Sequence, residues 1–343
     1  MGKKRGEAGL IQAGEIPAMK TIAKKFAPPT RAQQAFLDTA SLIRTEPLTD
    51  ADRGYITRQL ILCTFPHSDP GDVPIWTRRN SNLILGIEPG RSLKTGQSFG
   101  YPWGIIPRLL LYWICTEVQH SKNIPELTEH DKRTLQLGRS LAAFMHAVGL
   151  NPDNGSGKKS DRHRLIGQMV RLFRAKITFE DAEAGHTGDS WRDMTVAPDG
   201  DLWWKAKDNP NQQQLFPSWI LLGERFYQAL LSFPVPVDTR ALKALKQSPL
   251  ALDLYAWVCY AAFPIVQKKR AAQFVPWSHL SKALGAEYSD PDDFRKRAGR
   301  YLRKVATLYD GLTIGRARGG FTIHATRLAV PQKDAARPLL SGR

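Results

Sequence analysis

Cysteine is scarce in this chain, which has three such residues among 343, namely Cys63, Cys115 and Cys259. Their odd number and the absence of paired, metal-type spacing argue against a disulfide framework and against a zinc cluster. Each lies in an apolar stretch typical of a helix, so we expect reduced core thiols in a cytoplasmic protein. The eight histidines form no His-x-His pair and no His-Glu-x-x-His motif, so the sequence predicts no metal site.

Long hydrophobic runs are also missing. The longest, "LYAWVCYAAFPIV" at 254–266, has 13 residues and contains Pro264, whereas a membrane-spanning helix needs about 20. The N-terminus is basic but lacks the apolar region of a signal peptide. We therefore expect a cytoplasmic protein without membrane attachment.

A complete phosphate-binding motif is absent too. The stretch "GSGKKS" at 155–160 has Pro152 where a P-loop needs its first glycine, and Lys159 where it needs Ser or Thr. No hydrophobic strand leads into this stretch, so a flexible basic turn is the better interpretation. No group of residues indicates catalysis, and we predict a protein that is not an enzyme and that binds no cofactor.

Acidic residues are outnumbered by basic ones. The chain has 49 Lys and Arg against 32 Asp and Glu, a net charge of +17 and a pI near 9.9. This balance favours an acidic partner, either nucleic acid or, less well, an anionic membrane. The excess of basic over acidic residues is greatest in "DDFRKRAGRYLRKVATLY" at 292–309, which has no acidic residue from Phe294 to Leu308. Its cationic residues are Arg295, Lys296, Arg297, Arg300, Arg303 and Lys304.

The phase of this segment predicts an amphipathic helix. At about 100° per residue, one arc holds the apolar residues Phe294, Ala298, Tyr301, Leu302 and Val305. Lys296, Arg300 and Arg303 fall on the opposite side, with Gly299 beside them. Solvated basic faces usually interleave Glu with Lys, and this helix does not. Contact with a polyanion is the favoured interpretation, and a solvated surface helix is the alternative.

A second basic helix is predicted at 162–176, "RHRLIGQMVRLFRAK". Its pattern Arg164-x-x-Gly167-x-x-x-Arg171 matches Lys296-x-x-Gly299-x-x-x-Arg303 in the later helix. An apolar helix precedes each, one with Trp113-Ile114-Cys115 and the other with Trp257-Val258-Cys259. Glycine inside a helix costs about 1 kcal/mol relative to Ala, so two glycines in register suggest that a partner backbone approaches closely. Chance similarity of two short strings is the alternative.

The order of short helix, turn, basic helix and hairpin predicts a winged helix-turn-helix in each half of the chain. The later copy starts with a helix at 277–285 closed by Gly285, and its hairpin at 311–328 turns at Gly319 and Gly320. Arg316 and Arg318 are spaced to lie on one side of that wing. In the first copy we expect strands at 177–181 and 191–204, with "PDG" as the hairpin turn, carrying Asp193, Asp199, Asp201, Trp203 and Trp204. An acidic, aromatic wing binds phosphate groups poorly and suits a contact with protein. We therefore expect that the two winged-helix copies are not equivalent.

The predicted fold class is mainly α with small β-hairpins, an α+β protein of two tandem winged helix-turn-helix domains. We expect helices at 31–44 and 49–63 before the first domain and a boundary near 234–238. The predicted divisions are a basic disordered arm at 1–29, N-terminal helices at 30–72, a first winged-helix domain at 73–233, a second at 234–330 and a tail at 331–343.

Three segments resemble the plasmid-encoded RepA replication initiators: "FGYPWGIIPRLLLYWICTEV", "LGRSLAAFMHAVGL" and "FPVPVDTRALKALKQSPLALDLYAWVCYAAF". The resemblance runs from about Asn82 to Thr326. It implies tandem winged-helix domains that bind repeated origin sequences, the iterons, and recruit host replication machinery. It also implies that the first domain supports dimerisation and a secondary DNA contact, while the second is the main iteron reader.

We therefore predict a sequence-specific double-stranded DNA-binding initiator of plasmid replication. Its expected partners are origin repeats, the host initiator and the replicative helicase, with a homodimer as a possible form. A winged-helix transcriptional repressor that regulates its own gene is the alternative, and an RNA-binding or scaffolding protein is a weaker one. The predicted DNA-binding residues are Lys158, Lys159, Arg164, Gly167, Arg171 and Arg174 in the first half, and Lys296, Arg297, Gly299, Arg300, Arg303, Lys304, Arg316 and Arg318 in the second.

Overall fold

The computed structural model of the protein describes residues 28–155, 157, 159–181, 191–205, 209, 211–284 and 288–332. Residues 1–38 form one unit and residues 39–343 another. In the first unit the described residues enter helix α2 (Arg31–Thr45), as predicted, after Thr30, whose hydroxyl accepts a hydrogen bond from the backbone N–H of Gln33. The predictions for most of the N-terminal arm and of the tail lie outside the described residues, as do Lys158 and Gly285.

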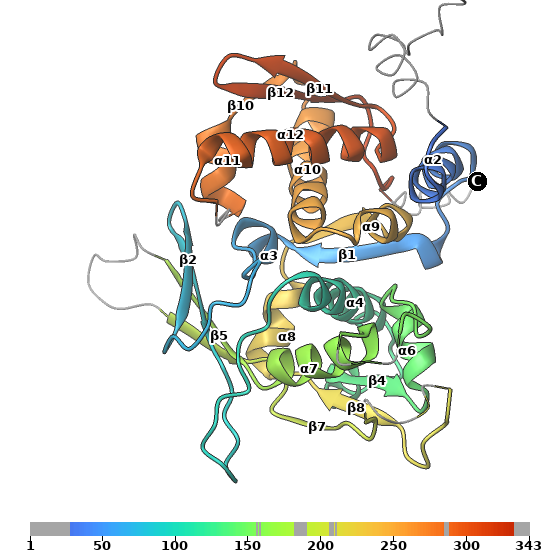
Figure 1. Ribbon diagram of the computed structural model, residues 1–343, viewed down its shortest axis with the longest axis vertical. Helices are drawn as coiled ribbons and strands as arrows, with labels where there is room; N and C mark the ends of the chain where they lie inside the picture. Colours follow the sequence, from blue (N-terminus) through green and yellow to red (C-terminus); the bar gives the residue numbers. More distant parts are fainter. Residues whose placement is uncertain are drawn as a thin grey trace, which may run out of the picture. The chain divides into compact units, whose positions relative to one another are not determined.

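Two apolar helices form the centres of the two halves of the larger unit, α4 (Ile105–Ser121) and α10 (Pro249–Gln267), and both were predicted (Figure 1). Ser248 caps α10 by accepting from the backbone N–H of Ala251, and Pro249 occupies the first turn, where no N–H partner is needed. Both helices are apolar nearly all round, so both are largely buried. Within the described residues α10 alone is long and apolar enough to cross a membrane, and most of it is buried inside the protein.

The second half builds a three-stranded sheet beside three helices. After α10 come β10 (Gln273–Pro276), α11 (Trp277–Leu284), α12 (Pro291–Leu308), β11 (Leu312–Ala317) and β12 (Gly320–Ala325). The strands are antiparallel in the order β10-β12-β11. Gly320 has to lack a side chain, because a Cβ there would collide with the carbonyl oxygen of Val275 on β10. The predicted hairpin is therefore confirmed, and β10 is an additional strand that the sequence analysis missed.

The first half follows the same order of helices but distributes its strands over two sheets. It contains α5 (Glu129–Arg133), β4 (Thr134–Gly138), α6 (Leu141–Ala147), α7 (Asp161–Phe173), β5 (Lys176–Asp181), β6 (Trp191–Thr195), β7 (Asp199–Asp201), β8 (Ser218–Leu221) and α8 (Glu224–Leu231). The sheet β2-β3-β5-β6 includes β2 (Trp76–Asn80) and β3 (Leu83–Glu88), whereas β4-β8-β7 is separate.

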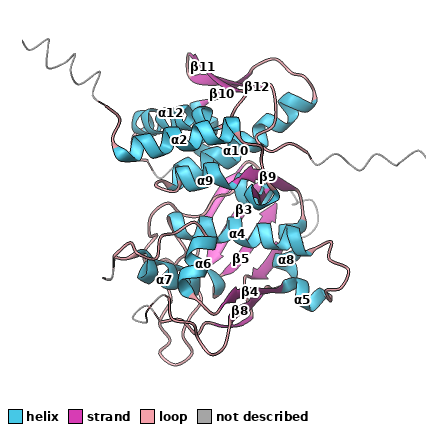
Figure 2. Ribbon diagram, turned by 90° about the vertical axis from the view of Figure 1, so that its right-hand side faces the viewer, coloured by secondary structure: helices cyan, strands magenta, loops and turns pink. Residues whose placement is uncertain are grey.

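The predicted "PDG" hairpin is wrong, because the strands on its two sides belong to different sheets. β6 pairs with β5, and β7 pairs with β8 from a later part of the chain. Asp199 and Asp201 therefore lie on β7 and not on a wing with Asp193. As Figure 2 shows, the strands form small groups among the helices, so the predicted α+β class is confirmed.

The segment before the first half is not the second helix that was predicted at 49–63. It contains the short helix η1 (Asp50–Asp52), the strand β1 (Arg53–Thr57) and the short helix α3 (Arg58–Leu62). β1 pairs with β9 (Pro234–Asp238), which precedes α9 (Thr239–Leu245), and the register places Arg53 opposite Asp238. The boundary predicted at 234–238 therefore falls on a paired strand inside the unit formed by residues 39–343, and the division into domains stays a prediction.

A buried ion pair joins the two central helices. The guanidinium of Arg108 on α4 donates two hydrogen bonds, of 2.7 and 2.8 Å, to the carboxylate of Asp253 on α10, which also lies 2.7 Å from Nε2 of His67. Burial by itself would raise the pKa of Asp253, but the charge of Arg108 and the hydrogen bonds from His67 and Arg108 outweigh it and lower that pKa to about 2. Burial also lowers the pKa of His67. The pair fixes how α4 and α10 meet.

Candidate nucleic-acid interface

Helix α12 has the two faces that its sequence predicts. Asp290 caps it by accepting from the backbone N–H of Asp292 at 2.8 Å, and two acids lie in its first turn, where the helix dipole favours negative charge. The buried residues are Phe294, Ala298, Leu302, Val305 and Leu308, and they pack against α10 and α11. Tyr301 was predicted on this stripe but is half-buried at its edge.

The surface of α12 outside its buried stripe presents cations to solvent. All of Arg295, Lys296, Arg297, Arg300, Arg303 and Lys304 are exposed. Arg295 pairs with Asp292 at 3.3 Å, Arg297 lies over the ring of Tyr288 at 5.5 Å, and Arg300 lies over Tyr301 at 5.2 Å. Stacking on an aromatic ring orients a guanidinium and leaves its N–H groups available. This surface can therefore donate many hydrogen bonds to an anionic partner.

The two helix glycines lie on exposed faces. A Cβ at Gly299 would meet only Trp277 and Arg303, both through side-chain atoms at 3.9 Å. A Cβ at Gly167 on α7 would meet nothing within 4 Å. Neither glycine is required by internal packing, so the close approach of an external backbone remains the reason that we propose for them.

The hairpin β11–β12 adds two cations beside α12. Arg316 lies on β11 opposite Phe321 of β12, Arg318 follows in the turn, and both side chains are exposed. Gly319 has φ +74°, a left-handed conformation that glycine adopts without strain. Gly319 thus allows the tight turn in which exposed Arg318 lies.

The basic helix α7 presents fewer free cations than its sequence predicts. Arg164 is exposed and pairs with Asp161 at 3.2 Å, and Lys159 is exposed at the approach to the helix. Arg171 is half-buried, with Nη1 3.3 Å from the carbonyl oxygen of Tyr101 and 3.4 Å from the carboxylate of Asp69. Arg171 therefore also holds a neighbouring segment in place, which the sequence pattern did not reveal.

The residues predicted for the first wing are dispersed. Asp193 on β6 accepts hydrogen bonds from Lys176 and Thr178, both at 2.8 Å, and the bond from Lys176 lowers its pKa. Trp204 is buried against Phe144, and half-exposed Trp203 packs on Phe216. Trp204 therefore belongs to the core of this half.

A sequence model of the plasmid-encoded RepA protein family matches residues 101–279, just over half of the chain. The chain belongs to this family. The family is one of plasmid replication initiators. The matched region of this RepA-family chain includes α7 and ends inside α11, so the assignment of α12 rests on its own residues and geometry.

Two solved structures of domains 2 and 3 of the protein RctB are also similar to the chain. One, a selenomethionine derivative, has 14% sequence identity and a TM-score of 0.47, and the match covers 79% of this chain and 99% of that one. The other has 13% identity and a TM-score of 0.43, with 77% and 94% covered. A search of curated proteins found no match.

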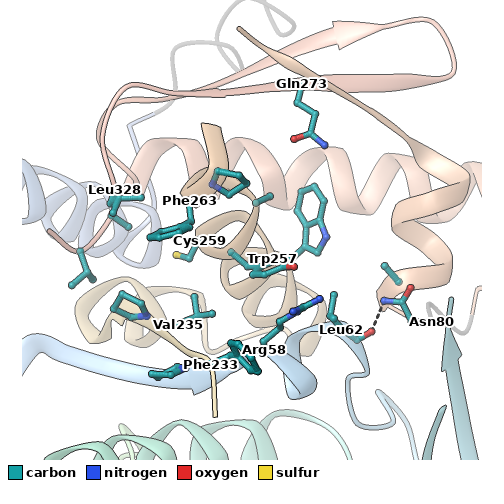
Figure 3. Close-up of a pocket in the computed structure, with 18 of the residues that line it drawn as sticks. Arg58, Leu62, Asn80, Phe233, Val235, Trp257, Cys259, Phe263, Gln273 and Leu328 are labelled. Atoms are coloured by element: carbon teal, nitrogen blue, oxygen red, sulfur yellow. Dashed lines mark hydrogen bonds between the residues drawn. The ribbon is translucent and has the colours of Figure 1, made fainter. Parts of the chain in front are cut away.

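The RepA-family chain also has an apolar groove with a volume of about 910 Å³ (Figure 3). Arg58 lies at this groove, with its guanidinium 5.9 Å from the ring centre of Phe233 and 5.8 Å from that of Tyr260. Phe233 and Phe263 expose 67% and 46% of their surfaces, which is unusual for large apolar residues. The apolar lining includes Phe233, Val235, Trp257, Tyr260, Phe263 and Leu328.

Sequence reasoning missed both this groove and a basic hairpin between β3 and α4, at residues 90–99. The hairpin's sequence, "GRSLKTGQSF", has two cations and no acid, a signal that is present in the sequence. The groove has no local signal, because its walls come from α3, β9, α10 and the segment after β12.

Proposed function

We propose that this chain is a plasmid replication initiator that binds double-stranded DNA in a sequence-specific way, at direct repeats of its origin. Membership of the RepA family supports the replication role. The observation that supports DNA reading is α12, whose one face is buried in the core while six cations on the rest of its surface are exposed. The proposal assigns no catalytic residue, cofactor or metal, and it places the protein on plasmid DNA in the bacterial cytoplasm.

The proposed architecture is a pair of tandem winged helix-turn-helix domains. In the second half, the succession α10, β10, α11, α12, β11, β12 and the sheet order β10-β12-β11 support it. α11 and α12 would be the helix-turn-helix, and β11–β12 the wing. The first half is a variant of this winged-helix arrangement. Its β5–β6 hairpin is extended into a sheet by β2 and β3, and it does not pair with β4, the strand before α6.

The two halves divide the work in this proposal. Lys296 and Arg300 lie in the N-terminal part of α12, which a recognition helix presents to base edges. Arg303, Lys304 and the wing arginines hold phosphates further along. In the first half, α7 supports a secondary DNA contact, and this half also carries dimerisation.

Recruitment of host replication proteins, the initiator and the replicative helicase, is assigned to the apolar groove. Its lining suits apolar side chains of a partner segment, while Arg58 and Arg270 at the groove favour acidic residues beside them. We therefore assign the groove to an acidic peptide segment with aromatic or aliphatic side chains from such a host protein. DNA is an unsuitable occupant because the groove is mainly apolar.

Footprinting on the DNA that flanks the gene tests the proposal. An initiator protects several direct repeats, and the logarithm of its affinity falls with the logarithm of salt with a slope of about −0.9 per phosphate contact. A nearly flat salt response, or the absence of any protected repeat, would contradict the DNA-binding role.

The second candidate function is a transcriptional repressor with the same DNA surface. A single protected inverted repeat over the gene's own promoter would favour it, because a symmetric dimer binds a palindromic site. Both patterns together indicate an initiator that also represses its own gene. RNA binding or scaffolding is a weaker candidate, and it predicts preference for single strands in the same experiment.

A further inference from the structure

The hairpin at residues 90–99 has a defined conformation. The backbone N–H of Phe99 donates to the carbonyl oxygen of Gly90 at 2.9 Å, and the N–H of Ser92 donates to that of Gln97 at 2.9 Å. Arg91 and Ser98 form a β-bridge between these pairs. Gly96, with φ +71°, closes the tip by donating to the carbonyl oxygen of Ser92 at 2.7 Å. The hairpin is the teal loop that projects at the bottom of Figure 1.

Leu93 lies at the tip of this hairpin with 97% of its surface exposed, the highest value for a large apolar residue in the described part of the chain. Burial of a leucine side chain is favourable, and Leu93 gains nothing from it here. A single exposed leucine is common on protein surfaces, so exposure alone indicates nothing.

The charges around Leu93 indicate a polyanionic partner. Arg91 and Lys94 flank it and are exposed. From Pro89 to Gly100 the chain has no acidic residue. An apolar tip between two cations combines the features that minor-groove proteins use, since cations meet the phosphates and an apolar wedge enters between two base steps.

The base of the hairpin is fixed to the C-terminal end of α7. A Cβ at Gly90 would collide with the carbonyl oxygen of Arg174, so the two backbones are in close contact. The guanidinium of Arg174 lies 5.6 Å from the ring centre of Phe99, and that of Arg171 packs against Gly100. The hairpin and the basic helix therefore move together, and DNA bound along α7 would meet the hairpin at a fixed position.

We propose that the hairpin Gly90–Phe99 binds the minor groove of origin DNA and that Leu93 inserts between two base pairs, while Arg91 and Lys94 hold the adjacent phosphates. Strands of β-ribbon proteins bind in the minor groove as well as in the major groove, and an inserted apolar wedge kinks the duplex. The cost of unstacking a base step is offset by the contacts that the bent DNA makes. This inference rests on the proposed function and adds that the first half distorts the duplex as well as contacting it.

The experiment compares the full chain with Leu93→Ser and with a control, Leu215→Ser, which alters a leucine that is 79% exposed before β8. Origin DNA carries a pair of fluorophores at its ends to report bending, and 2-aminopurine at successive positions to report unstacking. The wild type and the control should bend the DNA and increase the fluorescence of 2-aminopurine at one step. Leu93→Ser should lose that increase and most of the bend, and its affinity should fall about tenfold or less, because unstacking offsets much of the gain from insertion.

Bending and unstacking by Leu93→Ser equal to the wild type would overturn the inference and leave the proposed function intact. A change in the sedimentation of Leu93→Ser without DNA, with DNA distortion unchanged, would instead identify the hairpin as a protein contact. If the wild type binds no origin DNA, the inference and the proposed function both fail. Combined Arg91→Ala and Lys94→Ala should lower affinity for all duplexes and reduce the salt slope by about 2.

Discussion

Replacing Gly299 with leucine separates the fold of α12 from its proposed contact with DNA. A Cβ at this position meets only side-chain atoms, of Trp277 and Arg303, at the ordinary distance of 3.9 Å. Glycine within a helix costs about 1 kcal/mol relative to Ala, and leucine is nearly as favourable as Ala. Gly299→Leu should therefore raise the free energy of unfolding by about 0.5–1 kcal/mol.

The same substitution should prevent specific binding. The leucine side chain would extend from the exposed face beside Lys296 and Arg300, and it would hold the helix away from the base edges. Losing two base contacts of about 1–3 kcal/mol each lowers the affinity for the cognate repeat at least about thirtyfold. Non-specific binding through phosphates should change little.

Gly167→Leu is the matched control, since a Cβ at Gly167 on α7 also meets open space. It should stabilise the protein by a similar amount and weaken binding to cognate and scrambled DNA by similar, smaller factors. The assay measures binding of each variant to the repeat and to a scrambled duplex, together with urea unfolding. Normal binding of the repeat by Gly299→Leu would refute the assignment of the α12 face, and the proposed reading role would fail with it.

Three further predictions concern other parts of the molecule. Arg300→Ala should lower affinity for the repeat roughly ten- to a hundredfold and leave non-specific binding unchanged, whereas Arg316→Ala should weaken both equally in the same assay. Because the folded-state pKa of Asp253 is lowered from 3.8 to about 2, the stability that it contributes, about 2 kcal/mol, is present above pH 4 and is lost as the pH falls towards 2. Asp253→Asn should therefore cost about 3–5 kcal/mol at pH 7, while Asp292→Asn, in an exposed pair, should cost about 1 kcal/mol or less; urea unfolding between pH 7 and pH 2 measures both. Phe263→Glu in the groove should leave repeat binding intact and abolish plasmid replication in cells. Replication at the normal level would contradict the proposal that the groove recruits host proteins.

The Asp253 prediction also separates structure from function. Asp253 and Arg108 are both buried, and their pair joins α4 to α10 without involving any exposed side chain of α12. Loss of stability in Asp253→Asn with unchanged specificity for the repeat is the expected result. A change in specificity at unchanged stability would mean that the junction of α4 and α10 controls how the DNA surface is presented.

The sequence by itself determined the helices and the two faces of α12. The apolar arc, the acidic first turn and the cationic outer arc are all set by neighbours within a few residues, because helical hydrogen bonds are local. For the same reason α4, α7 and α10 follow from short stretches of sequence, as do the serine caps of α7 and α10. The β11–β12 hairpin was also predictable, since its turn glycines and its strands are adjacent in the chain.

Only the tertiary structure decided how strands from distant parts of the chain pair. β1 was expected to be helical and is a strand because β9 lies beside it. β7 leaves its expected hairpin because β8 supplies its hydrogen bonds. Strand pairing satisfies backbone groups with partners that the local sequence does not specify. The packing of Arg171 on Gly100 and the walls of the apolar groove likewise depend on residues from distant parts of the chain. The sequence therefore determined which residues carry the charge, and the tertiary structure decided which of them reach solvent together.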